Sequence, residues 1–298
     1  MKTLIVAHDA GGAQVLSSWV ARQEDQSRFV FSVEGPALEI FSKKIETFKN
    51  IKIESAISSA NSIITTTSWA SDIEISALKR FKDLEGPHSV VLLDHWINYR
   101  ERLLYRNQLI LPNEIWVTDH FASELALKTF CKIPVSIIHN YYLDEVINKV
   151  YKLRHSYLGN KVRTKLQILF VGENISTNCE RTHGDANFYG YTEQESFIYF
   201  LERINQFGNL QNIVLTIRPH PSETAEKYTS LIPVSLKEKL NYFVSKNSLE
   251  IDLAKSDLVV GMSSFALYIS ANAQIRTLCV IPNSSIKCVI PDPRIERF

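Results

Sequence analysis

Short apolar runs alternate along the chain with longer stretches in which apolar positions recur at helical spacing. Apolar runs of roughly four to eight residues are typical of strands buried on both faces, and intervening helices are typical of βαβ units. The pattern therefore predicts an α/β protein built on parallel sheets. In the first half we expect strands at Thr3–Ala7, Phe29–Val33, Ser62–Thr66, Ser89–Leu93, Glu114–Thr118 and Val135–Ile138, with helices at Asp72–Leu84 and Phe121–Phe130.

A polar and basic stretch, Tyr151–Lys165, interrupts the alternation and is interpreted as a linker around Gly159, Asn160 and Lys161. The chain then divides into two Rossmann-like domains, residues 1–150 and 151–298, which are expected to face a central cleft. Open α/β sheets bind ligands beyond the carboxyl ends of their strands, so function is sought there. In the second half we expect strands at Leu166–Val171, Asn212–Ile217, Asp257–Gly261 and Arg276–Ile281, and helices at Glu195–Phe207, at Leu236–Val244 and from near Phe265.

Composition narrows the class of protein. The chain has 298 residues and a formal net charge of +1, which gives no sign of a nucleic-acid partner. The apolar run Leu4–Ala7 is too short for a signal peptide, and no run approaches the roughly 20 apolar residues of a membrane span. We therefore expect a cytoplasmic protein without a transmembrane segment, with peripheral membrane contact left open.

The four cysteines, Cys131, Cys179, Cys279 and Cys288, include no Cys-x-x-Cys pair. Their spacing is not that of a zinc site or of a disulfide framework, so we expect reduced, structural thiols. No aspartate-rich motif is evident either. The sequence therefore predicts neither a metal nor a separate cofactor.

The first candidate site follows the first strand. His8 and Asp9 precede Gly11-Gly12, where paired glycines would let the backbone approach a ligand and a helix N-terminus would offer free N–H groups. The spacing is not the G-x-G-x-x-G fingerprint of dinucleotide sites. A tight turn capped by Asp9 is the structural alternative.

The segment after the fourth strand, residues 93–102, gathers an acid, an imidazole, two aromatic residues and two arginines, and its candidate site residues are Asp94, His95, Trp96 and Arg100. Such a group can orient a polyhydroxylated acceptor and deprotonate one of its hydroxyls. A surface ion-pair network, with Trp96 in the packing, is the alternative. After the fifth strand, Asp119 is expected mainly to cap the next helix.

Three strand ends of the second half carry a further candidate site. In Arg218-Pro219-His220-Pro221, the prolines would hold Arg218 and His220 rigidly where they could meet a phosphate. Gly261-Met262-Ser263-Ser264 combines glycine, small hydroxyls and a helix N-terminus, as anion sites do. Gly172-Glu173 follows the first strand of this half, where Glu173 could contact a base or a sugar.

His220-Pro221 and the pair Ser263-Ser264 resemble motifs of bacterial sialyltransferases and related GT-B transferases that use CMP-activated nonulosonic acids. In those families the two motifs hold the cytidylate phosphate, and an acidic motif of the amino-terminal domain supplies the base. The resemblance implies that residues 1–150 are the acceptor-side domain and residues 151–298 the nucleotide-sugar-binding domain. It implies metal-independent transfer of a sialic-acid-like sugar from a CMP donor to a bacterial surface glycan or a lipid-linked glycan.

Within that resemblance, His220, Ser263 and Ser264 would stabilise the departing phosphate, and Arg218 would add positive charge. The families' triplet of two acids and a glycine is missing here, so both Asp9 and Asp94 are candidates for the base.

Two alternatives stay open. UDP-sugar transferases and UDP-GlcNAc 2-epimerases also carry a His-Pro segment, but they usually place a glutamate on the helix after the glycine-serine turn. Residues 265–270 contain no acid, which favours a CMP donor. Residues 283–298 are too few for a long closing helix, which motivates a non-catalytic nucleotide- or glycan-binding homologue as the third interpretation.

Overall fold

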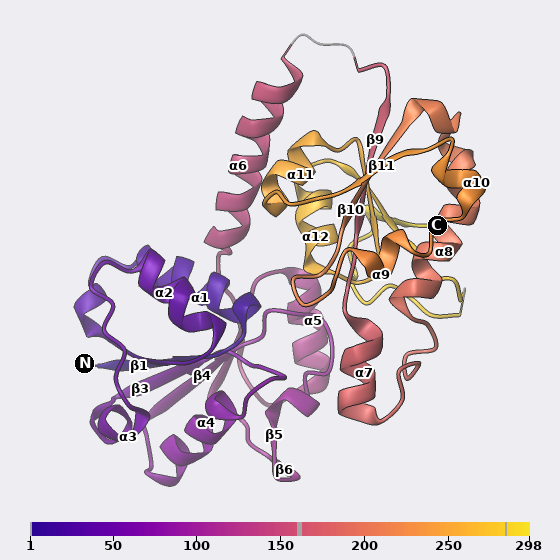
Figure 1. Cartoon of the computed structure of the whole chain (residues 1–298). Coiled ribbons are helices and arrows are strands. Elements are labelled where there is room, and N and C mark those ends of the chain that lie inside the picture. Colours follow the sequence, from indigo (N-terminus) through magenta and orange to yellow (C-terminus); the bar gives the residue numbers. More distant parts are fainter. Residues whose placement is uncertain (1, 160–162, 284) are drawn as a thin grey trace. The chain divides into compact units, whose positions relative to one another are not determined.

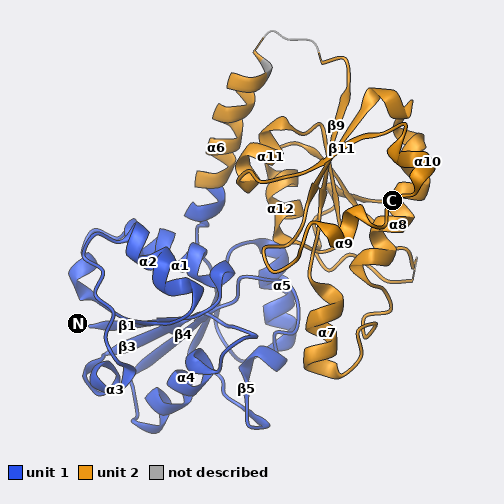
Figure 2. Ribbon diagram, viewed as in Figure 1, with its two compact units in different colours: residues 1–144 blue, residues 145–298 orange. Residues whose placement is uncertain are grey.

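A computed structural model of the chain describes residues 2–159, 163–283 and 285–298. The chain forms two compact units, Met1–Asp144 and Glu145–Phe298 (Figure 2). The helix α6, Tyr141–Leu158, contains this division and also runs through most of the stretch expected to be a linker. The first part of the stretch interpreted as a linker is therefore helical. Asn160 and Lys161 of the expected linker lie outside the described residues.

Unit 1 is built on a six-stranded parallel sheet in the order β2-β1-β3-β4-β7-β8. Its strands agree with the predicted ones to within one residue at each end. Figure 1 shows α1 and α2 on one face of this sheet and α3 and α4 on the other. The strands are β1 (Thr3–Ala7), β2 (Phe29–Val33), β3 (Ser62–Thr65), β4 (His88–Leu92), β7 (Glu114–Val117) and β8 (Val135–Ile137), and a small antiparallel hairpin joins β5 (Leu104–Tyr105) to β6 (Gln108–Leu109). The helices are α1 (Ala10–Ala21), α2 (Pro36–Lys44), α3 (Ile53–Ala56), α4 (Ile73–Asp83) and α5 (His120–Thr129), with 3-10 turns η1 (Gln26–Arg28), η2 (Ile57–Ser59) and η3 (Glu101–Leu103).

Unit 2 repeats the plan with a six-stranded parallel sheet in the order β11-β10-β9-β12-β13-β14. Its strands are β9 (Leu166–Val171), β10 (Ile213–Arg218), β11 (Asn241–Val244), β12 (Leu258–Gly261), β13 (Arg276–Cys279) and β14 (Ile295–Arg297). Besides α6, its helices are α7 (Ile175–His183), α8 (Glu193–Arg203), α9 (Glu226–Thr229), α10 (Val234–Lys237), α11 (Leu249–Lys255) and α12 (Phe265–Asn272), with 3-10 turns η4 (Ile204–Phe207) and η5 (Leu210–Asn212). Two parallel α/β sheets with helices confirm the predicted fold class.

One predicted element of unit 2 is wrong. The helix expected at Leu236–Val244 ends at Lys237, and Asn241–Val244 forms the edge strand β11 beside β10. The alternation of exposed and half-buried residues along β11 has a period of two, which fits a strand with one covered face. Strand β14 was not predicted, and it extends the opposite edge by pairing with β13.

Chain order within each sheet fixes where a ligand site can form. In unit 1 the chain leaves β1 toward β2 and then returns to β3 on the other side of β1. In unit 2 it leaves β9 toward β10 and returns to β12 on the other side. The crossovers therefore diverge at the carboxyl ends of β1/β3 and β9/β12, and such switch points leave room for a ligand.

An aromatic cluster forms the core between the unit 2 sheet and its helices. The Phe170 ring lies 4.6 Å from the ring of Phe197 and 5.9 Å from that of Phe200, measured between centroids. The ring of Tyr228 lies 5.7 Å from it. All four side chains are buried, so this cluster stabilises β9 directly beneath the strand end that carries Gly172 and Glu173.

We expect Phe170→Ala to lower the free energy of unfolding of unit 2 by about 3 to 5 kcal/mol, because it leaves a cavity in this cluster. Phe243→Ala, on the edge strand with the side chain 49% exposed, should cost less than about 1 kcal/mol. Far-UV circular dichroism in urea measures both transitions. The four tryptophans, Trp19, Trp69, Trp96 and Trp116, all belong to unit 1, so tryptophan fluorescence follows that unit separately. Equal losses in the two variants would contradict the assignment of the core.

Candidate functional site

The switch point of unit 2 brings the segments after β9 and β12 into contact. The backbone N–H of Ser263 donates a hydrogen bond of 2.5 Å to Glu173 Oε1, and the N–H groups of Met262 and Ser264 also face this carboxylate. The turn that was expected to hold a phosphate thus holds the carboxylate of Glu173. The N–H groups that were predicted to bind a phosphate face an internal carboxyl group in this structure.

Burial raises the pKa of Glu173 to about 7, although the three N–H groups favour the ionised form and oppose this rise. The carboxyl group therefore changes charge near neutral pH. Protonation of Glu173 weakens its hydrogen bonds to the N–H groups of the turn, because a neutral carboxyl group accepts weaker hydrogen bonds than a carboxylate.

Two glycines of this site are required by close packing. A Cβ atom on Gly172 would lie 2.5 Å from the hydroxyl oxygen of Tyr228, and one on Gly261 would lie 2.7 Å from Cδ1 of Leu267. Both distances are shorter than any van der Waals contact. Gly172 and Gly261 are thus explained by packing within unit 2.

His220 lies at the carboxyl end of β10 with its ring orientation fixed. Ser222 donates its N–H to Nδ1 of His220 at 3.3 Å, and its hydroxyl lies 2.7 Å from the same atom. The side-chain amide of Asn174 donates in turn to the Ser222 hydroxyl at 2.9 Å. Because Nδ1 accepts, the proton of the neutral ring is on Nε2. Burial lowers the pKa of His220, which favours that neutral form.

The loop carrying His220 is anchored by Glu223. Its carboxylate accepts the backbone N–H of His220 at 2.9 Å, the hydroxyl of Tyr228 at 2.9 Å and the ammonium group of Lys227 at 2.7 Å. Lys227 also pairs with the buried carboxylate of Glu193. This network holds the His220 backbone to α8 and α9, and the sequence analysis gave Glu223 no role.

Arg218 and Pro221 lie differently from what was expected. The guanidinium group of Arg218 donates to the buried carboxylate of Asp252 at 2.8 Å and to the carbonyl of Asn247 at 2.7 Å. Its charge is therefore neutralised within the unit. Pro221 is exposed in the turn after His220, and the next helix, α9, begins only at Glu226. Ser264 caps α12 by accepting the N–H of Ala266 at 3.3 Å, which leaves its hydroxyl hydrogen available for a ligand.

In unit 1, His8 and Asp9 meet at the end of β1. Nδ1 of His8 lies 2.8 Å from one carboxylate oxygen of Asp9, and the other oxygen accepts the backbone N–H of Trp69 at 3.0 Å. Both oxygens of Asp9 are thus occupied. The carboxylate of Asp9 does not cap α1, although Asp9 stands at the N-cap position.

Gly11 and Gly12 let the first turn of α1 approach neighbouring strand ends. A Cβ on Gly11 would lie 2.5 Å from Oδ2 of Asp94, and one on Gly12 would lie 2.7 Å from Cβ of Thr66. The close approach expected of these glycines therefore exists, and its partners are protein side chains. It also brings Asp94 beside the segment that carries Asp9.

The segment after β4 separates into buried and exposed parts. Oδ1 of Asp94 is buried without a hydrogen-bond partner and lies 4.0 Å from the guanidinium group of Arg102. Arg102, which the sequence analysis did not select, donates to the Thr67 hydroxyl at 2.8 Å and lies over the ring of Trp69. Arg100, which it did select, is exposed. The two arginines lie close together in one polar segment, and the sequence does not indicate which of their side chains is buried.

Two further candidates of this segment serve the packing. Trp96 is buried and donates its indole N–H to the carboxylate of Asp119, at 3.0 Å to the nearer oxygen. Asp119 also caps α5 by accepting the N–H of Ala122 at 2.8 Å, as expected. Burial lowers the pKa of His95, so its ring is held neutral. These contacts make Trp96 a support for the loop rather than a surface for a ligand.

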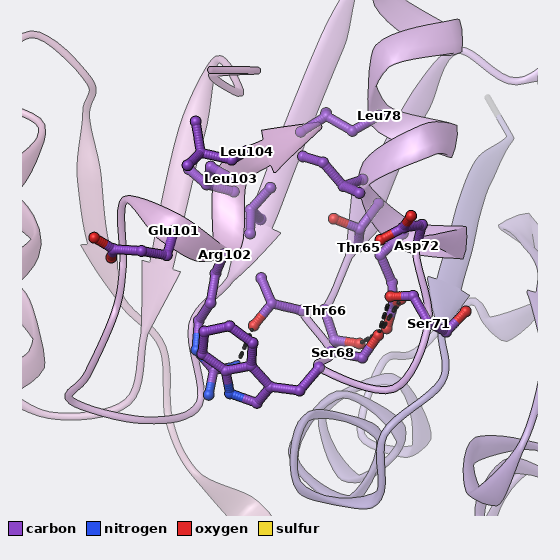
Figure 3. Close-up of a pocket in the computed structure, with 15 residues that line it drawn as sticks. Thr65, Thr66, Ser68, Ser71, Asp72, Leu78, Glu101, Arg102, Leu103 and Leu104 are labelled. Atoms are coloured by element: carbon purple, nitrogen blue, oxygen red, sulfur yellow. Dashed lines mark hydrogen bonds between the residues drawn. The ribbon is translucent and has the colours of Figure 1, made fainter. Parts of the chain in front are cut away.

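A cavity of about 150 Å³ opens beside Arg102 (Figure 3). The figure shows residues of the η3 segment on one side and residues of the loop before α4 on the other. Glu74 lies at its polar end, where its carboxylate accepts the N–H of His8 and the hydroxyls of Thr66 and Ser68. Burial raises the pKa of Glu74. The cavity has an apolar wall formed by Ile75, Leu78, Val91, Leu103 and Leu104.

Among the described residues, no helix is both long and apolar enough to cross a membrane. In the same part of the chain, no group of three or more histidine, cysteine, aspartate or glutamate side chains is placed to hold a metal ion.

No family model and no curated protein matches the chain by sequence. Solved structures match its fold. The UDP-GlcNAc 2-epimerase of Neisseria meningitidis, bound to UDP-GlcNAc, has a TM-score of 0.63 at 10% identity, over 99% of this chain and 87% of its own. A glycosyltransferase of Rickettsia africae has a TM-score of 0.55 at 12% identity, over 93% and 79%. MurG of Acinetobacter baumannii has a TM-score of 0.52 at 11% identity, over 95% and 79%. The chain thus shares the fold of two Rossmann-like domains with these proteins.

We expect the stability of unit 2 to depend on Glu173 between pH 4.5 and about 7. Because the folded-state pKa is raised, the folded state holds the proton more tightly, and stability falls as pH rises through this window. The fall amounts to about 3 kcal/mol. Glu173→Gln should lack this fall, while the exposed Glu226→Gln should keep it. Urea unfolding followed by circular dichroism at several pH values measures the difference, and parallel curves for all three proteins would refute the assignment.

Proposed function

We propose that the chain is a nucleotide-sugar-dependent glycosyltransferase in which unit 2 binds the phosphate of the donor and unit 1 binds the acceptor. The observation that carries this proposal is His220, whose ring is fixed with its Nε2–H free at the carboxyl end of β10. Support comes from the fold, which is similar to that of a glycosyltransferase and of an epimerase bound to UDP-GlcNAc.

In this proposal, Nε2–H of His220 donates to an oxygen of the donor phosphate, and the hydroxyl of Ser264 donates to another. As the bond between the sugar carbon and the phosphate oxygen breaks, negative charge collects on the leaving phosphate. Hydrogen bonds to that charge strengthen in the transition state, so they accelerate transfer rather than only binding. The backbone N–H of Ser263 acts indirectly, because its hydrogen bond to Glu173 holds the turn in shape.

Asp94 is the better candidate for the general base. Both carboxylate oxygens of Asp9 already accept hydrogen bonds, whereas Oδ1 of Asp94 accepts none. A base needs an unoccupied oxygen to receive the proton of the acceptor hydroxyl. The guanidinium group of Arg102 lies 4.0 Å from Oδ1 of Asp94 and places a positive charge beside it.

For the donor, we propose a CMP-linked sugar, such as a nonulosonic acid. Helix α12 contains no acidic residue that could hold a ribose in the manner of UDP-sugar enzymes, and the motifs at His220 and Ser263-Ser264 resemble those of CMP-dependent transferases. A UDP-sugar enzyme is the second candidate, and the fold similarity to the epimerase bound to UDP-GlcNAc favours it. A glycan or a lipid-linked glycan is the proposed acceptor.

We expect His220→Ala to weaken binding of the nucleotide by about tenfold or more, because a hydrogen bond to a charged group contributes about 1.5 to 3 kcal/mol. His155→Ala, at an exposed position of α6, is the matched control. Calorimetric titration with CMP and with UDP measures the affinities and identifies the nucleotide. If the His220 variant binds each nucleotide as tightly as the wild type does, the phosphate site is refuted.

We expect Asp94→Asn to lower the transfer rate by about 100-fold to 10,000-fold while nucleotide affinity stays unchanged, because only the base is removed. Asp9→Asn should have a much smaller effect. Transfer from CMP- and UDP-sugars to glycan acceptors is followed by release of the nucleotide. A larger loss in the Asp9 variant would reverse the assignment, and nucleotide binding without any transfer by the wild type would indicate a non-catalytic homologue.

A further inference from the structure

The fold brings two distant thiols of unit 2 together behind the Gly261–Ser264 turn. Cys279 ends β13, and Cys288 lies in the loop that leads toward β14. Both sulfur atoms face the carbonyl oxygen of Met262, at 3.0 Å from Cys279 and 3.6 Å from Cys288. When Cys288 is ionised, the Cys279 thiol can donate its hydrogen bond to the Cys288 sulfur instead. The sequence interval between them gave no sign of this contact.

Arg297 keeps the loop between the two cysteines in place. Its guanidinium group donates to the carbonyl of Ile281 at 3.0 Å and to that of Asn283 at 2.5 Å, and it also contacts the carbonyl of Ile286. These carbonyls belong to the segment that separates Cys279 from Cys288. Arg297 therefore fixes the segment that joins Cys279 to Cys288, and with it the position of the two thiols.

The two thiols differ in access and acidity. Cys279 is fully buried, whereas Cys288 is partly exposed. The hydrogen bond from Cys279 lowers the pKa of Cys288, and the same bond, together with burial, raises the pKa of Cys279. The thiolate is the reactive form of cysteine, so Cys288 is the thiol that reacts first with an oxidant.

We propose that Cys279 and Cys288 are a redox modification site that closes to an intramolecular disulfide when the protein meets a low-molecular-weight disulfide. The Cys288 thiolate attacks one sulfur of the small disulfide, which forms a mixed disulfide and releases one small thiolate. The Cys279 thiol gives its proton to solvent and attacks the Cys288 sulfur, which releases the second small thiolate, and the two small thiolates take up the two protons that the cysteines have lost. Two protein thiols are oxidised, and one small disulfide is reduced to two thiols.

Closure acts on the Gly261–Ser264 turn. A disulfide places its sulfurs about 2.05 Å apart, much closer than two thiols in contact, and it has no S–H donors. The carbonyl of Met262 then loses both of its thiol partners. An unpaired buried carbonyl costs about 1 to 3 kcal/mol, so the turn is displaced toward new partners. The effect on nucleotide binding rests on the proposed function, whereas disulfide formation does not.

The test begins with a Cys131→Ser background, which removes the exposed thiol of unit 1. The purified full chain is incubated with oxidised glutathione and analysed by mass spectrometry without reduction. We expect the mass of the protein to fall by two hydrogen atoms, and digestion to give a peptide that links Cys279 to Cys288. After denaturation, one thiol, that of Cys179, should remain. Cys279→Ser in the same background should instead keep glutathione attached to Cys288. A stable glutathione adduct on Cys288 of the background protein, or no reaction, would overturn the proposal.

The second measurement compares the affinity of the reduced and oxidised proteins for CMP and UDP by calorimetric titration. We expect oxidation to weaken the affinity for whichever nucleotide the reduced protein binds by about tenfold, and we expect dithiothreitol to restore that affinity. The Cys288→Ser protein, treated in the same way, should show no change. A disulfide that leaves affinity unaltered would overturn the coupling to the turn. If the reduced protein binds neither nucleotide, the proposed function fails, while the mass measurement still decides the modification site.

Discussion

Every polar group of the two candidate sites depends on one constraint, which is that the parallel strands of each sheet are buried on both faces. Inside the sheets, the strands β1, β9 and β12 are almost wholly apolar and buried. Polar side chains therefore gather at the ends of the strands, and the candidate sites lie at the carboxyl ends. Because crossovers diverge at β1/β3 and β9/β12, those ends also leave space. His8, Asp94, Glu173 and Ser263 lie where they do for this reason.

Most charged groups of these sites pair with other groups of the protein. Glu173 occupies the N–H groups of the turn, and Arg218 is neutralised by Asp252. Charged groups away from water are costly unless paired or hydrogen-bonded, so these contacts stabilise each unit. Among the groups that the proposed function uses, Nε2–H of His220 in unit 2 and Oδ1 of Asp94 in unit 1 keep hydrogen-bonding capacity. A hydrogen-bond donor for phosphate and an acceptor for a proton are what glycosyl transfer requires.

The Gly261–Ser264 turn connects three properties of unit 2. Its N–H groups face Glu173, whose pKa of about 7 makes the contact sensitive to pH. Its Met262 carbonyl faces Cys279 and Cys288, which makes the other side of the turn sensitive to oxidation. Ser264 caps α12, and its hydroxyl is the proposed ligand contact. One short segment thus combines a proton-dependent contact, a thiol pair and a candidate ligand contact.

The sequence by itself determined ten of the twelve strands of the two sheets, because the period of apolar residues is a local property that a strand or a helix imposes on its own segment. It also placed His220, Ser264 and Asp94 at strand ends, since a strand end is read from the same pattern. It failed at Leu236–Val244, where apolar residues in a short segment fit a helix or an edge strand equally well. Only the tertiary structure decided which arginine turns inward, Arg102 rather than Arg100, and that Arg218 pairs with Asp252. Only it decided that Glu173 fills the turn and that Cys279 meets Cys288, because hydrophobic periodicity carries no information about which side chains meet.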